Sequence, residues 1–523
     1  MKVEKIDKTR IILAAASGLM LTGSFPNIDF GWLIWIAFVP LLIAIRNCGV
    51  KKSFVLGFAT GMVHYMTLLY WVVYTMRTYG YLPWPVCVLI LILFSMVLAA
   101  YIAVFSVAVS RMQLMPVAGL ITIPSVWVGL EWVRSFFLTG FPWESIGHSQ
   151  YHTLHIIQIS DTLGAYGISF LVLLVNTALF FLYLSLRRYD WHGTLISRRF
   201  AAVSLAGCLL LLGLDWLYGA HRLSAVDQMV KSVPAIRLKV IQGNIEQSLK
   251  WNPKFQISTI EKHLHLSQST GDQKPDLIIW PETALPFYFQ HNVPLTTKVS
   301  RGIQEIGTYF ITGSPSFARR IHRIDYYNSA YLIGPDGIPL EKYDKTHLVP
   351  FGEYVPLKRW LPFLDKLVEQ VGDFDRGEVG DTITWKDNKL GILICYELIF
   401  PYISRAMVRN GATLLINITN DAWYGRSSAP YQHFSMAVFR AVENRRALVR
   451  SANTGISGFI DPAGRIQTAT PLFEEAAATQ NVPILSGLTF YTRFGDVFAK
   501  VCLAIAAMAL LYQEMRRRKT KKA

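Results

Sequence analysis

The feature that most constrains the fold is a series of apolar segments, each about as long as a bilayer is thick. A transmembrane helix needs about 20 largely apolar residues, and eight segments approach that length. With 52% hydrophobic and only 16% charged residues, the chain is too apolar for a single soluble domain. The sequence therefore predicts a multispan α-helical membrane domain. The expected spans are residues 10–26, 31–46, 53–75, 83–109, 114–134, 162–186, 199–218 and 494–513.

Basic residues show how these spans would be oriented. The net charge is +16, but the lysines and arginines form short runs beside apolar segments rather than one patch interleaved with aromatic residues, which argues against nucleic acid as a partner. Such runs tend to stay on the cytoplasmic side of a membrane. The runs at residues 2–10 and 516–522 and the alternation between loops predict cytoplasmic termini. We therefore expect a multi-pass protein of the bacterial inner membrane with residues 219–493 in the periplasm.

The predicted domains follow from the same pattern. Residues 1–218 would hold the first seven spans, residues 219–493 a periplasmic catalytic domain, and residues 494–523 the last span and the basic tail. In the middle part, short apolar runs alternate with polar helical stretches, which is typical of an α/β domain. We expect helices at residues 404–411 and 431–446 and a hairpin turn at 334–337. The expected strands are residues 236–241, 276–280, 309–312, 329–333, 390–394 and 413–417.

Three residues of this middle part suggest covalent chemistry. Cys395, its only cysteine, follows the apolar run Gly391–Ile394, and Glu282 follows another such run. Lys345 lies just after the expected hairpin. A thiol to attack a carbonyl, a carboxylate to take the proton and an ammonium to hold negative charge make an acyl-transfer site. A helix beginning near Pro401 would favour the thiolate. Taken singly, each residue could instead be an ordinary surface charge or a buried thiol.

Longer motifs surround these residues and extend into the apolar half. They are Gln242–Gln247, Trp280–Ala284, Tyr343–Pro356, Cys395–Glu397, Asn417–Trp423, Arg440–Arg445, Gly140–Glu144 and Gly164–Phe170. In these stretches residues 219–493 resemble the nitrilase or carbon-nitrogen hydrolase superfamily. Over nearly its whole length the chain is similar to the membrane-embedded branch of that superfamily, the apolipoprotein N-acyltransferase family.

The resemblance implies an α-β-β-α sandwich with the catalytic triad Glu282, Lys345 and Cys395. Cys395 would be the nucleophile and Glu282 the general base, while Lys345 and the Tyr396 backbone N–H would stabilise the oxyanion. The remaining site residues implied by the family are Glu353, Tyr396 and Glu397 as supporting residues and Trp251 and Trp423 as substrate-binding residues.

The implied reaction is a two-step acyl transfer. An sn-1 acyl chain would leave a phospholipid, expected to be phosphatidylethanolamine, and form a thioester with Cys395. The α-amino group of the diacylglyceryl-cysteine of an apolipoprotein would then take the chain. We expect no cofactor and no metal, because residues 219–493 contain neither a phosphate-binding glycine loop nor paired ligands at metal-binding spacing. Residues 357–368, which mix bulky apolar and basic side chains, are expected to form an interfacial arm.

Two other classes remain open from the sequence alone. A membrane-tethered nitrilase-type amidase would use the same triad on a small amide, but it would not need seven preceding spans. A multispan receptor or transporter with a periplasmic binding domain would need no reactive Cys395.

Overall fold

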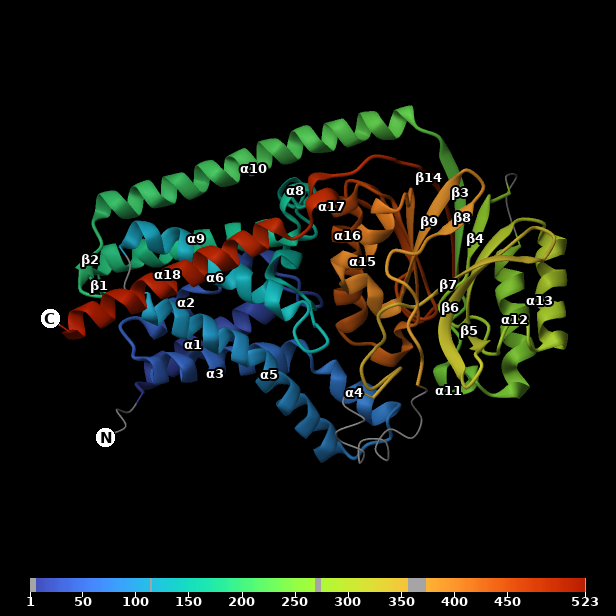
Figure 1. Cartoon of the computed structure of the whole chain (residues 1–523), viewed down its shortest axis with the longest axis horizontal. Coiled ribbons are helices and arrows are strands. Elements are labelled where there is room, and N and C mark those ends of the chain that lie inside the picture. The colour runs from blue at the N-terminus through green and yellow to red at the C-terminus, as the bar shows by residue number, and fades with distance from the viewer. Residues whose placement is uncertain (1–5, 113–114, 269–273, 356–372, 523) are drawn as a thin grey trace. The chain divides into compact units, whose positions relative to one another are not determined.

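The chain forms two compact units (Figure 1). The computed structural model describes residues 6–112, 115–268, 274–355 and 373–522. Unit 1 comprises Met1–Leu223 and Phe494–Ala523, and unit 2 comprises Ser224–Arg493. The boundary expected at residues 218/219 falls inside one continuous helix, α10 (Arg198–Ser232). The expected arm at 357–368 lies outside the described residues.

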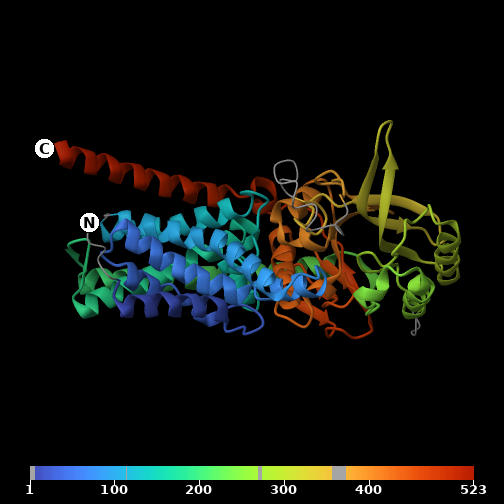
Figure 2. The same ribbon diagram turned by 90° about the horizontal axis from the view of Figure 1, so that it is seen from below.

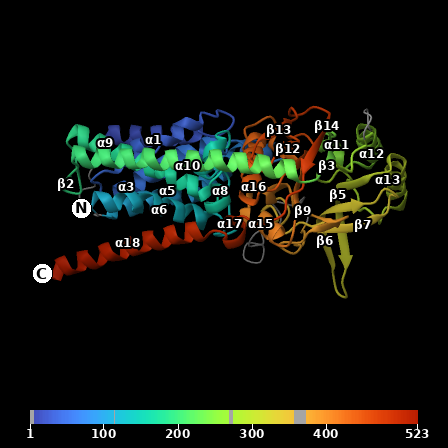
Figure 3. The same ribbon diagram turned by 90° about the horizontal axis from the view of Figure 1, so that it is seen from above.

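Unit 1 is helical apart from one short hairpin. Its long helices are α1 (Lys8–Gly23), α3 (Val50–Leu68), α5 (Trp84–Arg111), α6 (Pro116–Arg134), α9 (Ala165–Arg187), α10 and α18 (Val497–Lys522). Its short elements are η1 (Gly31–Trp35), α2 (Val39–Ile45), α4 (Trp71–Thr78), η2 (Ile146–Gln150), α7 (Leu154–Ile157), α8 (Ser160–Leu163), β1 (Asp190–Trp191) and β2 (Thr194–Leu195). Figure 3 shows α10 running along unit 1, where Cys208 packs against Leu174 and Ala178 of α9.

The structure gives fewer membrane-length helices than the eight expected segments. Among the described residues, α5, α6, α9, α10 and α18 are long and apolar enough to cross a membrane, and α3 with α4, bent by 52°, make a sixth candidate. The difference lies at the start of the chain. Helix α1 has only 16 residues, and the segment at 31–46 is divided into η1 and α2. The chain is therefore a membrane protein with five or six candidate spans.

Basic residues meet at one end of unit 1, the end that carries both termini and the β1–β2 hairpin (Figure 1). Arg10, in the first turn of α1, donates to the backbone oxygens of Ala44 and Arg46. Arg46 in turn forms an ion pair with Asp190 at 3.3 Å. Arg517 donates to the carbonyl of Arg111. Basic residues that are far apart in the sequence thus lie at the same end of unit 1.

Unit 2 is built on two mixed sheets of six strands each. In the first sheet the order is β14 (Ala476–Pro483), β3 (Ala235–Gln242), β4 (Leu277–Ile279), β5 (Tyr309–Arg319), β6 (Ile324–Ile333) and β7 (Pro339–Asp344). In the second the order is β13 (Ile466–Ala469), β12 (Gly458–Ile460), β11 (Leu448–Ala452), β10 (Leu414–Thr419), β9 (Asn388–Ile394) and β8 (Ile383–Trp385). The central strands β3–β4–β5 and β9–β10–β11 are parallel, and Figure 2 shows the far end of the β5–β6 hairpin projecting beyond its sheet.

The two sheets stack face to face, and helices cover their outer faces. Ser451 of β11 donates to the carbonyls of Ile241 and Ile279 in the facing sheet. Ile260 and Ile303 of the covering helices pack on the outer face of that sheet. The helices of unit 2 are α11 (Gln247–Lys250), α12 (Pro253–Ser267), α13 (Val293–Ile306), η3 (Cys395–Ile399), α15 (Pro401–Arg409), η4 (Asp421–Tyr424), α16 (Ala429–Asn444) and, at its end, α17 (Phe490–Phe494). The unit is an α/β sandwich.

The expected elements of unit 2 are confirmed. Each of the expected strands lies in or overlaps an observed strand, and the turn at 334–337 joins β6 to β7 as an antiparallel hairpin. The central strands were recognisable because they are buried on both faces: every residue of β10 is buried, and so are the last five of β9, so they read as continuous apolar runs. Helix α15 ends before Gly411, whose φ of +100° suits glycine.

Candidate active site

Cys395 lies where the central strand β9 ends. It is the first residue of the 3-10 turn η3 and is 6% exposed. Its φ of +53° falls in the left-handed region, which a side chain with a Cβ adopts only when its surroundings enforce it. The turn directs the thiol away from the path of the strand. A sharp strand-to-turn transition of this kind is a common way to present a nucleophile.

The carboxylate of Glu397, two residues further on, holds this turn in place. Its Oε2 accepts the backbone N–H of Ile394 at 2.7 Å. Its Oε1 accepts the backbone N–H of Thr346 at 2.6 Å and of His347 at 3.1 Å, and Tyr343 donates its hydroxyl to the same group. Glu397 is fully buried. It therefore ties the end of β9 to the segment that follows β7.

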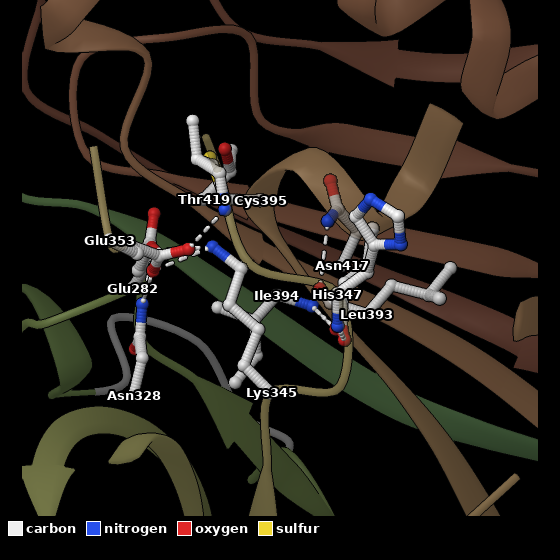
Figure 4. Close-up of polar contacts among 12 residues, drawn as sticks. Glu282, Asn328, Lys345, His347, Glu353, Leu393, Ile394, Cys395, Asn417 and Thr419 are labelled. Carbon is white, nitrogen blue, oxygen red and sulfur yellow. Dashed lines mark hydrogen bonds and ion pairs between the residues drawn. The ribbon is translucent and has the colours of Figure 1, made fainter. Parts of the chain in front are cut away.

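Lys345 stands in that tied segment, between two carboxylates (Figure 4). Its Nζ lies 2.9 Å from Glu353 Oε1 and 3.7 Å from Glu282 Oε1, and its side chain is 1% exposed. Burial alone would lower the pKa of Lys345, but the carboxylates of Glu353 and Glu282 outweigh it and raise the pKa. Lys345 is therefore a permanent ammonium. Glu353 is its nearer partner, and the role of Glu353 in orienting Lys345 stays a prediction.

Asn328 completes the cluster from the neighbouring strand. Its Nδ2 lies 2.8 Å from Glu282 Oε1 and 2.8 Å from Glu353 Oε1. The two carboxylates thus face an ammonium and an amide, which is the compensation that buried charges require. The backbone N–H of Lys345 donates to the Asn328 carbonyl, because the β6–β7 pairing that joins Ser329 to Asp344 continues by one residue.

The thiol of Cys395 is protonated in the resting site. Burial and the negative charge of Glu282 raise its pKa to about 12, while the Lys345 ammonium acts in the opposite direction. The expectation that a helix near Pro401 would favour the thiolate is wrong in direction. The turn η3 separates Cys395 from α15, and the cost of burying a charge exceeds the attraction of nearby dipoles. A base must therefore remove the proton during attack.

A second buried network contacts the backbone of Cys395. His433 Nε2 lies 3.2 Å from the carbonyl oxygen of Cys395, and its Nδ1 lies 3.1 Å from Asp421 Oδ1. Arg450 pairs with Asp421 at 2.7 Å, and neither side chain is exposed. Although burial opposes it, Arg450 and His433 lower the pKa of Asp421 to about 2. This network fixes the backbone of Cys395 in its unusual conformation.

Lys250 holds the backbone at Glu282 in a similar way. It is 2% exposed, and its Nζ donates to the backbone oxygen of Glu282 at 3.0 Å. The sequence motifs did not single out Lys250, Asn328 or His433 as site residues. Asn328 could have been found by extending the hairpin register from the turn at 334–337, and Lys250 by its place beside Trp251. His433 carries no comparable signal, because only the tertiary fold brings it to Cys395.

The remaining predicted residues differ in exposure and in their contacts. Tyr396 is 7% exposed and follows the nucleophile directly. Trp251 is 51% exposed and borders a pocket of about 670 Å³ with Phe287 and Tyr288. Trp423, in η4, is 38% exposed. His347 stacks on Phe400 with ring centroids 3.8 Å apart. Within the described residues, no group of three or more histidine, cysteine, aspartate or glutamate side chains could hold a metal ion.

Comparison with known proteins decides the family. Residues 17–178 match the apolipoprotein N-acyltransferase N-terminal domain, and residues 238–484 match the carbon-nitrogen hydrolase family. An apolipoprotein N-acyltransferase of Geobacter metallireducens is 44% identical over 506 residues, which is 97% of this chain and 95% of the relative. The chain belongs to the apolipoprotein N-acyltransferase family. A member from Chlorobaculum tepidum is 30% identical over 534 residues, covering 97% of both chains.

Membership identifies the chain as a membrane-embedded acyltransferase with a carbon-nitrogen hydrolase domain. It decides against the amidase and the receptor or transporter as alternatives. Among solved structures, an amidase from Nesterenkonia sp. matches 50% of this chain and 92% of its own at 18% identity and a TM-score of 0.36. A likeness at that level says nothing further about function.

The raised thiol pKa predicts how Cys395 reacts with a small water-soluble alkylating agent. Below its pKa of about 12, the thiolate fraction grows about tenfold per pH unit, so the alkylation rate should rise without levelling off between about pH 6 and about pH 9. Lys345→Met should lower the rate at every pH, because the ammonium favours the thiolate. Peptide mass spectrometry would follow the modification at Cys395.

The matched control is Lys342→Met, three residues earlier on β7, where Lys342 Nζ pairs with Asp344 at 2.9 Å. This substitution should leave the rate unchanged. A plateau near neutral pH would contradict the protonated resting state. An unchanged rate in a folded Lys345→Met protein would show that this ammonium does not act on the thiol.

Proposed function

We propose that this enzyme moves an sn-1 acyl chain from a phospholipid, through a thioester on Cys395, to the α-amino group of a diacylglyceryl-cysteine apolipoprotein. The observation that carries the proposal is the buried cluster of Glu282, Lys345 and Glu353 at a protonated thiol. Such a site can both activate a thiol and stabilise an oxyanion. Both relatives are named as apolipoprotein N-acyltransferases. We take the class of the acyl acceptor, an apolipoprotein, from that name.

In the first half-reaction Glu282 takes the proton from Cys395 Sγ as the sulfur attacks the sn-1 ester carbon. The carbonyl oxygen becomes an oxyanion, which the Lys345 ammonium and the Tyr396 backbone N–H stabilise, each donor contributing about 3 kcal/mol. The bond between the carbonyl carbon and the glycerol oxygen then breaks. Glu282 returns the proton to that oxygen, and a lysophospholipid leaves.

In the second half-reaction the neutral α-amine of the acceptor attacks the thioester carbon. Glu282 takes a proton from the nitrogen, the carbon–sulfur bond breaks, and the proton returns to the sulfur. Lys345 keeps its proton throughout, because Glu353 and Glu282 raise its pKa. A thioester suits this sequence because it remains reactive toward amines, provided that water is kept out. Trp251 and Trp423 are proposed to contact substrate.

We also propose that the protein crosses the bacterial inner membrane with both termini in the cytoplasm and unit 2 in the periplasm. The meeting of Arg10, Arg46, Arg111 and Arg517 at one end of unit 1 supports this orientation. Eight crossings remain the proposal for the full topology, with α1 and the η1–α2 stretch as short elements that cross close to their neighbours. Shorter helices can span where the bilayer thins or flanking residues snorkel.

The two half-reactions predict separable kinetics. With phospholipid alone the enzyme should release about one equivalent of lysophospholipid and stop, and adding a diacylglyceryl-cysteine peptide should restart release. Glu282→Gln should slow both steps by about 100- to 10,000-fold, because it removes the general base. Cys395→Ala should abolish both.

Glu305→Gln on the exposed face of α13 is the matched control and should leave both steps unchanged. Continued lysophospholipid release without acceptor would indicate hydrolysis rather than transfer. Normal release in a folded Cys395→Ala enzyme would exclude the thioester.

The orientation predicts which introduced cysteines a membrane-impermeant thiol reagent can reach in intact spheroplasts. Asp336→Cys, on the exposed β6–β7 turn, should be labelled without permeabilisation. Arg518→Cys in the basic tail should be labelled only after the membrane is opened. The native cysteines are all buried and should give little background. Labelling of Arg518→Cys in intact spheroplasts would overturn the proposed orientation.

A further inference from the structure

The proposed chemistry leaves one buried ion of unit 2 without a task, the ammonium of Lys250. This side chain is 2% exposed, and its Nζ donates to the backbone oxygen of Glu282 at 3.0 Å. Within the part of the chain that the structure describes, no carboxylate forms a direct ion pair with that nitrogen. Burying an ammonium without such a partner costs free energy. The position of Lys250 therefore indicates a function in the site rather than a contribution to stability.

The segment after β3 holds Lys250 in place. The backbone N–H of Ile245 donates to Asn453 Oδ1 at 2.9 Å, and Asn453 Nδ2 donates to the carbonyl of Ile245 at 2.8 Å. Asn420 Nδ2 donates to Gln247 Oε1 at 2.6 Å. Gln247 is the first residue of the four-residue helix α11, and Lys250 is the last. Side chains that follow β10 and β11 thus fix the short helix that carries the lysine.

The peptide group that Lys250 contacts is the one that follows the base. It joins Glu282 to Thr283, whose φ of +51° lies in the left-handed region. Gly313 packs so closely against the same peptide that a Cβ there would collide with the backbone nitrogen of Thr283. A residue keeps such a conformation only when its surroundings enforce it. The hydrogen bond from the ammonium is stronger than one from a neutral donor, and it is one of the contacts that hold this peptide.

The charge of Lys250 also acts on the site. The proposed reaction needs Glu282 as a carboxylate, and Glu353 lies on the other side of the Lys345 ammonium. Two carboxylates and one ammonium leave a net negative charge, which a second ammonium balances. Burial lowers the pKa of Lys250 to about 8, while Glu282 and the thiolate form of Cys395 act in the opposite direction. Because this interaction is mutual, the ammonium of Lys250 stabilises the ionised form of Glu282.

We propose that Lys250 is a positioning residue for the general base: its ammonium holds the Glu282–Thr283 peptide and keeps Glu282 ionised, so that Glu282 can take the proton of Cys395. The inference rests on the proposed function, in which Glu282 is that base. The site then uses two ammonium groups for two tasks, Lys345 for the oxyanion and Lys250 for the base. Without Lys250, the excess of negative charge favours a protonated Glu282, which cannot accept the proton of the thiol.

The neighbouring groups make a pH profile a specific test of this role. The other titratable groups that face Lys250 or Glu282 are His263, Lys345, Glu353, Cys395 and Tyr424. Burial lowers the pKa of His263 to about 4 and raises that of Cys395 to about 12. Burial also raises the pKa of Tyr424, and the carboxylates raise that of Lys345 although burial opposes them. Between about pH 6 and about pH 8, a change in rate therefore reports the two carboxylates and Lys250.

The test measures acylation of Cys395 in a single turnover of the full-length protein, followed by intact mass with phosphatidylethanolamine as the donor. Lys250→Met keeps the length of the side chain but removes its charge and its donor. It should slow acylation by about 10- to 100-fold at about pH 6. The difference from the wild type should shrink toward about pH 8, because more of Glu282 is ionised there and because wild-type Lys250, with a pKa of about 8, begins to lose its own proton.

Lys250→Gln keeps a donor without the charge and should show the same pH-dependent loss, so it serves as the second variant if Lys250→Met does not fold. The matched control is Lys298→Met on α13, where Lys298 pairs with Glu261 at 2.7 Å on the surface, and it should leave the rate unchanged. Wild-type rates in both folded Lys250 variants, a loss that is equal at every pH, or failure of both variants to fold would overturn the proposal. A wild-type protein that forms no thioester would instead count against the proposed function.

Discussion

Burial of charge is the constraint on which the active site depends. The Lys345 ammonium and the carboxylates of Glu282 and Glu353 lie together in a place that is almost inaccessible to water. Burying any one of these groups alone would cost free energy, because an unpaired ion loses its hydration and gains no compensating interaction. Asn328 supplies an additional donor to both carboxylates. The same burial keeps the thiol of Cys395 protonated, and in the proposed mechanism Glu282 removes that proton.

The backbone around the nucleophile depends on two further carboxylates. Glu397 collects N–H groups from the end of β9 and from the segment that carries Lys345, so nucleophile and cation are held by one side chain. Asp421, through His433, supports the carbonyl of Cys395 on the other side. Asp421 also forms a buried ion pair with Arg450. Removing one partner of a buried ion pair typically costs about 3–5 kcal/mol. The strained φ of Cys395 can therefore persist, and the site is preorganised before substrate binds.

Much of unit 2 could be predicted from sequence, because buried parallel strands read as apolar runs and their ends mark where reactive side chains emerge. This logic placed Glu282 and Cys395, and the hairpin turn placed Lys345. It could not give Asn328, Lys250 or His433, whose roles arise from contacts across sheets or between distant segments. Nor could it give the direction of the Cys395 pKa, since local sequence shows nearby dipoles but not the depth of burial. The short α1 and the broken η1–α2 stretch show the same limit in unit 1, where hydropathy reveals apolar length but not where a helix stops.

The central claim is that Cys395 itself carries the acyl group. The most direct measurement is the intact mass of the purified protein after incubation with a phospholipid of one defined acyl chain and no acceptor. The account predicts a gain of one acyl group, mapped to Cys395 by peptide fragmentation and lost when a diacylglyceryl-cysteine peptide is added. Acyl transfer to that peptide by a protein that never shows the adduct, or an adduct located on another residue, would contradict it.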